Sequence, residues 1–207
     1  MNNIENSNFF SKIRDQFKNN FKYVIFLFFI LLIIISSFYI YNYLIDKNIY
    51  KTSISYNSSK NLNSEEDFLK SMIEISKNKN FFGILASLDI INNNIENNNY
   101  NAAFNNYIKI LEEKNLDKVY KSLISIHSSY NLIDNIEISK IYNLLKYYDQ
   151  SVESFLGFYS EILFLLSILE KDDNKTIKLY NEILSNNKIS EQIKQRVKKI
   201  NEFEKNK

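Results

Sequence analysis

The chain of 207 residues has no cysteine, proline or tryptophan, only one histidine and only two glycines. Without cysteine it can form no disulfide, thiolate metal site, cysteine nucleophile or lipidated N-terminal cysteine. With no proline and so little glycine, a hairpin-rich β architecture is not expected, because tight turns depend on Gly, Pro and Asn-Gly. No glycine-rich loop is present to cradle a phosphate, which excludes the common nucleotide-binding motifs.

Three residue types dominate what is present: 32 Asn, 32 Ile and 24 Lys. All three have codons rich in A and T, so the asparagine runs at 92–94 and 97–99 are interpreted as drift in an AT-rich genome, tolerated where helices end. Polar asparagine tracts can also mark disorder. Apolar residues recur at helical spacing on both sides of these runs, which favours the first interpretation.

The strongest single signal is an uncharged run of 23 residues, 23–45. At about 1.5 Å per residue such a helix is about 34 Å long, enough to cross a hydrocarbon core of about 30 Å. Tyrosine, which prefers the interfacial depth, stands at both ends of the run, as Tyr23, Tyr39, Tyr41 and Tyr43. We expect an uncleaved transmembrane signal anchor. A cleaved signal peptide and a buried core helix are the alternatives, although the run is long for a signal peptide and no A-x-A-like site follows it.

Flanking charge predicts the orientation of this span, because Lys and Arg are retained on the cytoplasmic side. Four basic residues precede the run, Lys12, Arg14, Lys18 and Lys22, and three follow it within a comparable length, Lys47, Lys51 and Lys60. We therefore expect residues 1–22 in the cytoplasm and the remainder outside. Apolar residues at helical spacing in the short segment fit either an amphipathic helix on the inner leaflet or a frayed tail: Phe9, Phe10, Ile13 and Phe17.

From Asp46 onward the chain carries 22 basic and 22 acidic side chains. Nucleic-acid binding needs a basic face, so no nucleic-acid partner is expected. The last twenty residues, 188–207, hold seven basic and three acidic side chains, which a solvated final helix explains.

Apolar residues between Phe68 and Phe203 recur with helical periodicity and predict eight helices joined by short polar connections, so that neighbours are antiparallel. The fold class is therefore all-α, one transmembrane helix followed by helix hairpins. Ser64, Ser151 and Ser190 are the expected caps of the first, sixth and eighth helices. The stretch 46–63, poor in apolar residues, is expected to form a stalk that continues the spanning helix.

A shift of the chain by 73 residues brings two stretches into register. Tyr107 falls on Tyr180 and Ile110 on Ile183, and other apolar positions fall on one another. This spacing is about two helix–turn–helix units of about 34–37 residues each. The match is one of apolar pattern, so a repeated solenoid and a generic helical bundle both remain open.

Two stretches carry a resemblance to known repeats. Residues 98–111, which include Ala102 and Ala103, look like the second half of one tetratricopeptide unit leading into the next, and residues 172–184 look like a second copy. The order of elements from Phe9 onward resembles that of the YfgM-like family, ancillary subunits of the SecYEG translocon, and most of all its divergent α-proteobacterial branch with AT-rich, Rickettsiales-type members. The chain departs from the repeat in having few of the small Ala and Gly residues that let such helices approach.

The resemblance implies a cytoplasmic segment 1–22, a signal anchor 23–45 in the bacterial inner membrane, a stalk 46–63 and a periplasmic tetratricopeptide-like α-solenoid 64–207. It implies a non-catalytic protein–protein interaction module that binds exported chains, periplasmic chaperones or the translocon. No motif fixes the binding positions. The alternatives are an envelope or division-complex scaffold, disfavoured by the absence of G-x-x-x-G in the span, a generic membrane-tethered adaptor, and an enzyme.

Little in the sequence points to catalysis. His127 is the only histidine, and on the 73-residue alignment it matches Ile200 on an apolar face, which predicts a packing role. No cluster of zinc ligands and no nucleophile-elbow signature accompanies it. Acidic groups are interpreted as helix ends: Glu65 to Asp67, Asp172 with Asp173, and Glu112 with Glu113. We therefore predict no catalytic, cofactor-binding or metal-binding residue and no small-molecule substrate.

Aromatic content is high, with 15 Tyr and 16 Phe. These residues either fill the core in place of leucine or line a groove where tyrosine anchors a peptide. Tyr147 and Tyr148 are the best candidates for an exposed pair.

Overall fold

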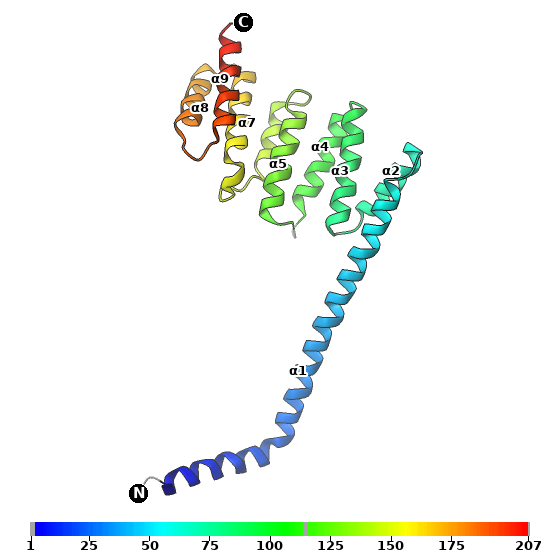
Figure 1. Cartoon of the computed structure of the whole chain (residues 1–207), viewed down its shortest axis with the longest axis vertical. Helices are drawn as coiled ribbons and strands as arrows, with labels where there is room; N and C mark the ends of the chain where they lie inside the picture. Colours follow the sequence, from blue (N-terminus) through cyan, green and yellow to red (C-terminus); the bar gives the residue numbers. More distant parts are fainter. Residues whose placement is uncertain (1–2, 114–115, 207) are drawn as a thin grey trace. The chain divides into compact units, whose positions relative to one another are not determined.

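A computed structural model describes residues 3–113 and 116–206 of the chain, with the side chains of residues 1–20 and Val24 outside the description (Figure 1). All regular structure among these residues is helical, with no strand, which confirms the all-α prediction. The chain divides into two compact units, residues 1–55 and 56–207.

The first unit consists of one helix, α1 (Asn3–Ser59), whose last turn belongs to the second unit. Its stretch Phe21–Ser59 is, among the described residues, the one helix long and apolar enough to cross a membrane. Its large apolar side chains are exposed on every side, as suits a helix in lipid. Helix α1 continues past the apolar run as far as Ser59, so residues 46–59 of the expected stalk 46–63 are helical. The predicted amphipathic face of Phe9, Phe10, Ile13 and Phe17 lies outside the described side chains.

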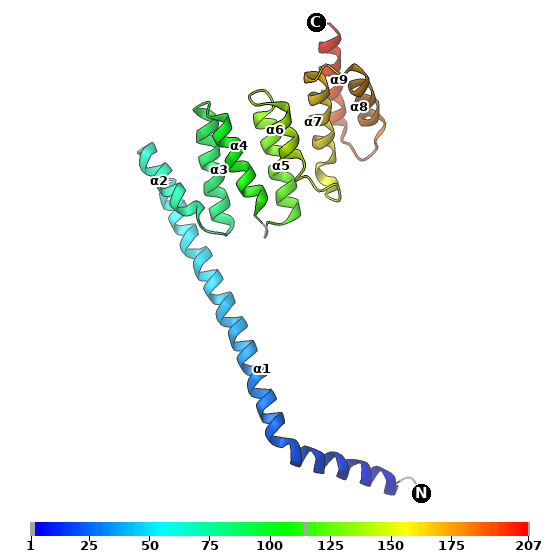
Figure 2. The same cartoon turned by 180° about the vertical axis from the view of Figure 1, so that it is seen from behind.

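The second unit holds the eight predicted α-helices. In chain order they are α2 (Glu65–Ser76), α3 (Phe81–Glu96), α4 (Tyr100–Glu112), α5 (Lys118–Leu132), α6 (Ile138–Leu145), α7 (Leu156–Leu169), α8 (Asp173–Ser185) and α9 (Glu191–Lys205), with a short 3₁₀ helix η1 (Glu153–Phe155) before α7. Successive helices lie side by side (Figures 1 and 2).

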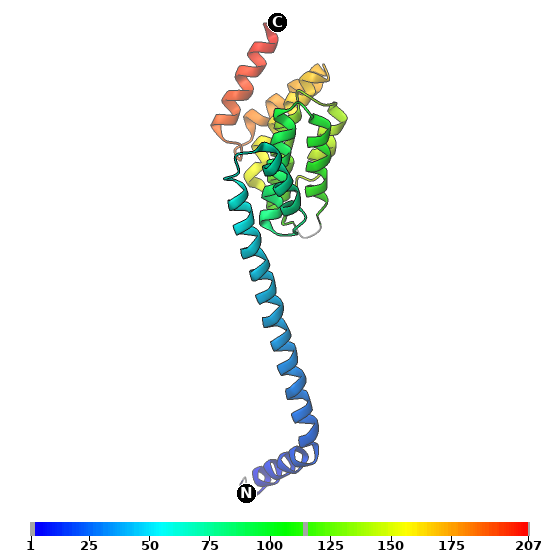
Figure 3. The same ribbon diagram turned by 90° about the vertical axis from the view of Figure 1, so that its right-hand side faces the viewer.

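Contacts between alternate helices show that the unit has two rows. The odd-numbered helices α5, α7 and α9 touch in sequence, and α4 touches α6. Figure 3 shows the two rows of the green α3–α6 region from the side. One large apolar cluster runs from α3 to α7, a second joins α7, α8 and α9, and a third joins Tyr56 to α2 and α3.

The 73-residue spacing reappears in the helix boundaries. Helix α4 begins and ends at 100 and 112, and α8 at 173 and 185; α5 begins and ends at 118 and 132, and α9 at 191 and 205. The first and last residues of α4 and α5 are therefore each 73 positions before those of α8 and α9. The last residue of α3 (81–96) is likewise 73 positions before the last residue of α7 (156–169).

The turns that join these helices repeat as well. The two non-glycine residues with positive φ in the described chain are Asn98, at 59°, and Lys171, at 57°, and they are 73 residues apart. Each is followed by an amide that bonds five residues back, Asn99 to the Asn94 carbonyl at 2.7 Å and Asp172 to the Ser167 carbonyl at 3.1 Å. This is the Schellman pattern of a helix C-terminus, and its recurrence at one spacing indicates equivalent hairpins.

Serine takes the place of the small residues that the sequence lacks. Ser122, Ser125, Ser128 and Ser129 on α5 are all fully buried. The Ser125 hydroxyl donates to the Leu144 carbonyl of α6 at 2.8 Å. A small side chain that bonds to the backbone of the next helix allows close approach without an unpaired buried hydroxyl.

The predicted caps are met in part. Ser64 accepts the Asp67 amide at 3.3 Å, as predicted. Ser190 occupies the cap position of α9 without a side-chain cap bond. The prediction for Ser151 is wrong: its amide donates to Asp149 Oδ1 at 2.8 Å, and α7 begins only at Leu156, after η1. A tight turn and a 3₁₀ helix therefore occupy the residues that were expected to start the helix.

Candidate functional site

The open side of α5 carries a stripe of apolar side chains. Val119 is 44% exposed, Tyr120 51% and Leu123 44%, and the exposed ring of His127 follows one turn later. The other side of α5 is buried against neighbouring helices. Exposed apolar side chains that gather on one face are a common mark of an interaction surface.

A polar network links three odd-numbered helices beside this stripe. The Tyr130 hydroxyl of α5 donates to Glu161 Oε2 of α7 at 2.6 Å. Arg196 of α9 donates from Nε to Glu161 Oε1 at 2.9 Å and from Nη2 to Oε2. The Glu161 side chain is 3% exposed and that of Arg196 51%. The Arg196 guanidinium carbon lies 5.7 Å from the centre of the Phe158 ring.

Tyr130 and Arg196 keep one ionisation state each at physiological pH. Burial, followed by the hydrogen bond to Glu161, raises the pKa of the Tyr130 hydroxyl, which therefore stays neutral. The hydrogen bond to Glu161 also raises the pKa of Arg196. The network thus presents a permanently positive guanidinium at the surface, held by a buried carboxylate.

The positions 73 residues before Glu161 and Arg196 are apolar. Subtracting 73 from 161 and 196 gives Leu88 on α3 and Leu123 on α5. We define the odd-helix face as Val119, Tyr120, Leu123, His127, Phe158 and Arg196. Val119, Leu123 and Tyr130 lie on one side of α5 by helical spacing, and Tyr130 is joined through Glu161 to Arg196, so this network links α5 to the α9 member of the face.

His127 lies at the surface of this face and not inside the apolar core, contrary to the expectation from its alignment with Ile200. Its Nδ1 is 3.1 Å from the Tyr107 hydroxyl, which also accepts a hydrogen bond from Asn131 Nδ2 at 3.1 Å. Partial burial lowers the pKa of His127. Its hydrogen-bond partners are a phenol and an amide, with neither a serine hydroxyl nor a carboxylate in the arrangement of a nucleophilic triad.

The described residues contain no group of three or more His, Cys, Asp or Glu side chains placed to hold a metal ion. The acidic helix starts and ends that the sequence indicated, Glu65 to Asp67 and Glu112 with Glu113, are exposed. Asp172 caps α8 by accepting the Lys175 amide at 3.0 Å, as predicted.

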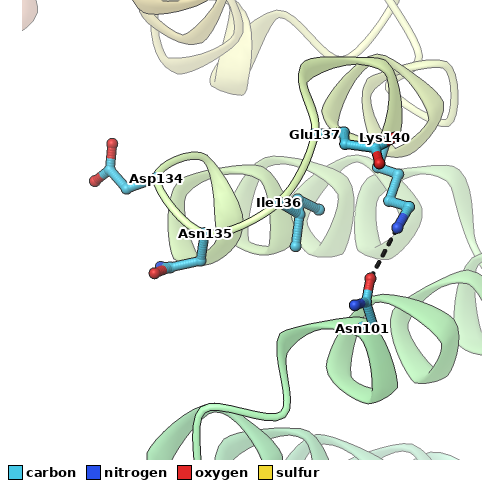
Figure 4. Close-up of a pocket in the computed structure, with 6 residues that line it drawn as sticks. All are labelled: Asn101, Asp134, Asn135, Ile136, Glu137 and Lys140. Carbon is cyan, nitrogen blue, oxygen red and sulfur yellow. Dashed lines mark hydrogen bonds between the residues drawn. The ribbon is translucent and has the colours of Figure 1, made fainter.

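An open depression lies between the turn after α5 and the start of α4 (Figure 4). Lys140 donates to Asn101 Oδ1 across it at 2.8 Å. The other lining residues are Asp134, Asn135, Ile136 and Glu137. Its breadth and the absence of any apolar side chain other than Ile136 distinguish it from an enclosed ligand cavity.

The predicted exposed pair Tyr147–Tyr148 is not found. Tyr148 is 7% exposed, its ring stacks on Tyr159 with centroids 4.4 Å apart, and its hydroxyl donates to the Val152 carbonyl at 3.0 Å. The turn through η1 brings Val152 back over Tyr148 and covers it. Among the described residues of the second unit, Tyr120 of α5 is the exposed tyrosine that the sequence argument missed.

Sequence reasoning also missed Glu161 and Arg196. One signal was available, because Glu161 is the single charged residue among the twelve residues 158–169, and Arg196 is one of two arginines in the chain. Their pairing depends on the array, since they are 35 residues apart.

No protein-family model, no curated protein and no solved structure matches this chain. The repeated helix pairs and the odd-helix face are therefore the features that bear on function.

Proposed function

We propose that the protein is a non-catalytic, membrane-anchored interaction module in which a tetratricopeptide-like array of helix pairs binds other proteins across the odd-helix face. The 73-residue register of helix boundaries and Schellman turns is the observation that carries this proposal. Stacked helix pairs of this kind offer an extended surface and contain no chemistry of their own.

The C-terminal end of the unit supports a closed array. On α5, Ser122, Ser125 and Ser129 are buried toward α6. Their counterparts 73 residues later on α9 are exposed polar residues, Gln195, Lys198 and Glu202. Terminal units of helical arrays have a polar outer face in place of the apolar face that receives the next unit. Helix α9 has this character, so binding is assigned to the face of the array and not to its C-terminal end.

The apolar helix supports an anchor. We propose that residues 23–45 remain uncleaved in the bacterial inner membrane, with 1–22 in the cytoplasm, 46–63 as a stalk and 64–207 in the periplasm. The length and exposure of the span and the excess of basic residues before it favour this arrangement. A module held there meets the SecYEG translocon, periplasmic chaperones or newly exported polypeptides, which we propose as its partner class.

Affinity recovery from detergent-solubilised membranes tests the function. We expect the full chain to recover translocon subunits, chaperones or exported polypeptides, and a variant ending at Asp46 to recover none of them. Crosslinking in intact membranes is the companion measurement. Crosslinks only between copies of this chain would favour the scaffold alternative and contradict the proposal, as would equal recovery by the truncated variant.

The anchor leads to a separate prediction. Because a span of this length is stable only in lipid, the protein should stay in the membrane pellet after carbonate extraction and should retain residues 1–45. Mass spectrometry of the purified protein identifies its N-terminus. Recovery of a soluble product whose first residue is 37 or later would show a cleaved signal peptide and overturn the anchor.

A further inference from the structure

We propose that the odd-helix face selects polypeptide segments that combine apolar with acidic side chains and rejects matched segments in which the acidic residues are basic. This inference rests on the proposed function and specifies the chemistry of its partner. It follows from the different character of the two ends of the face.

The α5 end of the face is apolar. Val119, Tyr120 and Leu123 together expose two aliphatic side chains and one aromatic ring within a turn and a half of helix. Lys121 is the one charged residue between Val119 and Leu123, and helical spacing places it on the side of α5 that faces the neighbouring helices. Burial of apolar surface is favourable at about 25 cal/mol per Å², so this end contributes affinity for apolar side chains of a bound segment.

The α9 end of the face is positive. Arg196 is half exposed, and Lys199, less than one turn further along, is exposed too. A guanidinium has five N–H donors, and Glu161 engages two of them. The other three are left for a ligand. Glu161 itself presents almost no surface, since its side chain is 3% exposed.

The carboxylates of α9 do not cancel this charge on the face. Glu191 pairs with Lys194 at 3.2 Å. Glu202 lies three residues from Lys199 on the polar outer side already described, and the half-buried Glu204 comes near the end of the helix. The residues of α9 three and four positions from Arg196 are Gln192, Ile193, Lys199 and Ile200, none of them acidic. A carboxylate side chain of a bound segment at Arg196 therefore meets two cations there, and a lysine or arginine meets two like charges.

The first copy supports a graded face. Where α7 and α9 carry Glu161 and Arg196, α3 and α5 carry Leu88 and Leu123. A segment lying across α5 and α9 therefore contacts aliphatic surface first and a cation next. A uniformly apolar or uniformly charged segment would satisfy only one end.

Binding of three labelled peptides to the full chain in lipid nanodiscs tests this inference by fluorescence anisotropy. The first combines leucine and tyrosine with aspartate and glutamate; the second replaces the acidic residues by lysine and arginine; the third keeps the acidic residues and replaces the apolar ones by serine. All are acetylated and amidated, so that only side chains are charged. We expect the first peptide to bind at least about tenfold more tightly than either of the others at low salt, and its advantage over the second to shrink in about 1 M salt.

Two substitutions separate the ends of the face. Lys199→Glu should remove most of the preference for the acidic peptide, and Leu123→Ala should weaken the acidic and the basic apolar peptides by the same factor. Lys178→Glu on α8 is the matched control, because it makes the same charge change on an exposed lysine of an even-numbered helix. It should leave the preference unchanged.

The outcomes distinguish this inference from the function beneath it. If no peptide binds and no partner is recovered from membranes, the proposed function fails. If peptides bind but the basic apolar peptide binds as tightly as the acidic one, or if Lys178→Glu acts as strongly as Lys199→Glu, the interaction module stands and the selectivity is overturned.

Discussion

Replacing Arg196 by leucine alone should lower the free energy of unfolding of the helical unit by about 3 kcal/mol, because it leaves the buried carboxylate of Glu161 without its cation. The Tyr130 hydroxyl would remain as its single strong hydrogen-bond donor. Urea denaturation of the full chain in detergent micelles, followed by circular dichroism at a helical wavelength, measures the loss.

Replacing both residues should reverse most of this loss. The double variant Glu161→Leu/Arg196→Leu removes the buried charge with its partner and places leucine at both positions, as at the positions 73 residues earlier, Leu88 and Leu123. Exchange of a buried ion pair for apolar residues of similar volume is often neutral or stabilising, so we expect the double variant within about 1.5 kcal/mol of the parent. Equal losses in the single and double variants would contradict both the coupling of the pair and the equivalence of the two copies.

An exposed ion pair supplies the control. Lys188 and Glu153 are 2.7 Å apart, with side chains 62% and 64% exposed. Surface pairs contribute little, so Lys188→Leu should change the free energy of unfolding by less than about 1 kcal/mol.

Local patterns determine much of this fold. Apolar spacing predicted all eight helices of the second unit. Ser64 and Asp172 cap α2 and α8 as expected, because a serine or aspartate side chain just before a helix can accept a hydrogen bond from a free amide of the first turn. The uncharged run 23–45 predicted a helix long and apolar enough to cross a membrane, since length and composition alone decide that property.

Features that depend on how the helices pack against one another could not be predicted from local sequence patterns. Lys171 adopts a left-handed conformation that its residue type does not favour, and only its equivalence to Asn98 would have indicated the turn. Tyr148 is covered by a turn through Val152, which no periodicity encodes. The close approach of α6 to α5 at Ser125 was not predicted, because serine fills the place that alanine and glycine usually take in such contacts.

The odd-helix face shows the same division. Val119, Tyr120 and Leu123 were part of a recognised apolar helix, but which side of α5 the neighbouring helices cover depends on packing. Glu161 was detectable as an acid in an apolar stretch but was missed, whereas its partner Arg196 is brought to it only by the packing of α7 against α9. The sequence thus contains the residues of this face, and the packing of the helices decides which of them are exposed and which are paired.

Gly83→Ala should destabilise the helical unit by about 2 kcal/mol or more, even though alanine in place of glycine inside a helix is ordinarily worth about 1 kcal/mol in the favourable direction. A Cβ at Gly83 would overlap the backbone carbonyl oxygen of Asn78, in the turn between α2 and α3. That turn is fixed from both sides, since Asn80 caps α3 by accepting the Gly83 amide at 3.1 Å. The overlap can be relieved only by moving the backbone of the turn.

Gly157→Ala on α7 is the matched control, because it makes the same substitution in another buried helical glycine. Its Cβ would lie 2.6 Å from Ile193 Cδ1 and 3.3 Å from Ile189 Cγ2, and a terminal methyl group can rotate away. The gain in helix propensity then offsets most of the crowding, so we expect a change within about 1 kcal/mol of zero. Thermal unfolding of both variants should place Gly83→Ala well below Gly157→Ala. The reverse order would contradict this prediction. It would mean that the backbone of the α2–α3 turn moves at a lower energetic cost than the Ile193 side chain between α7 and α9.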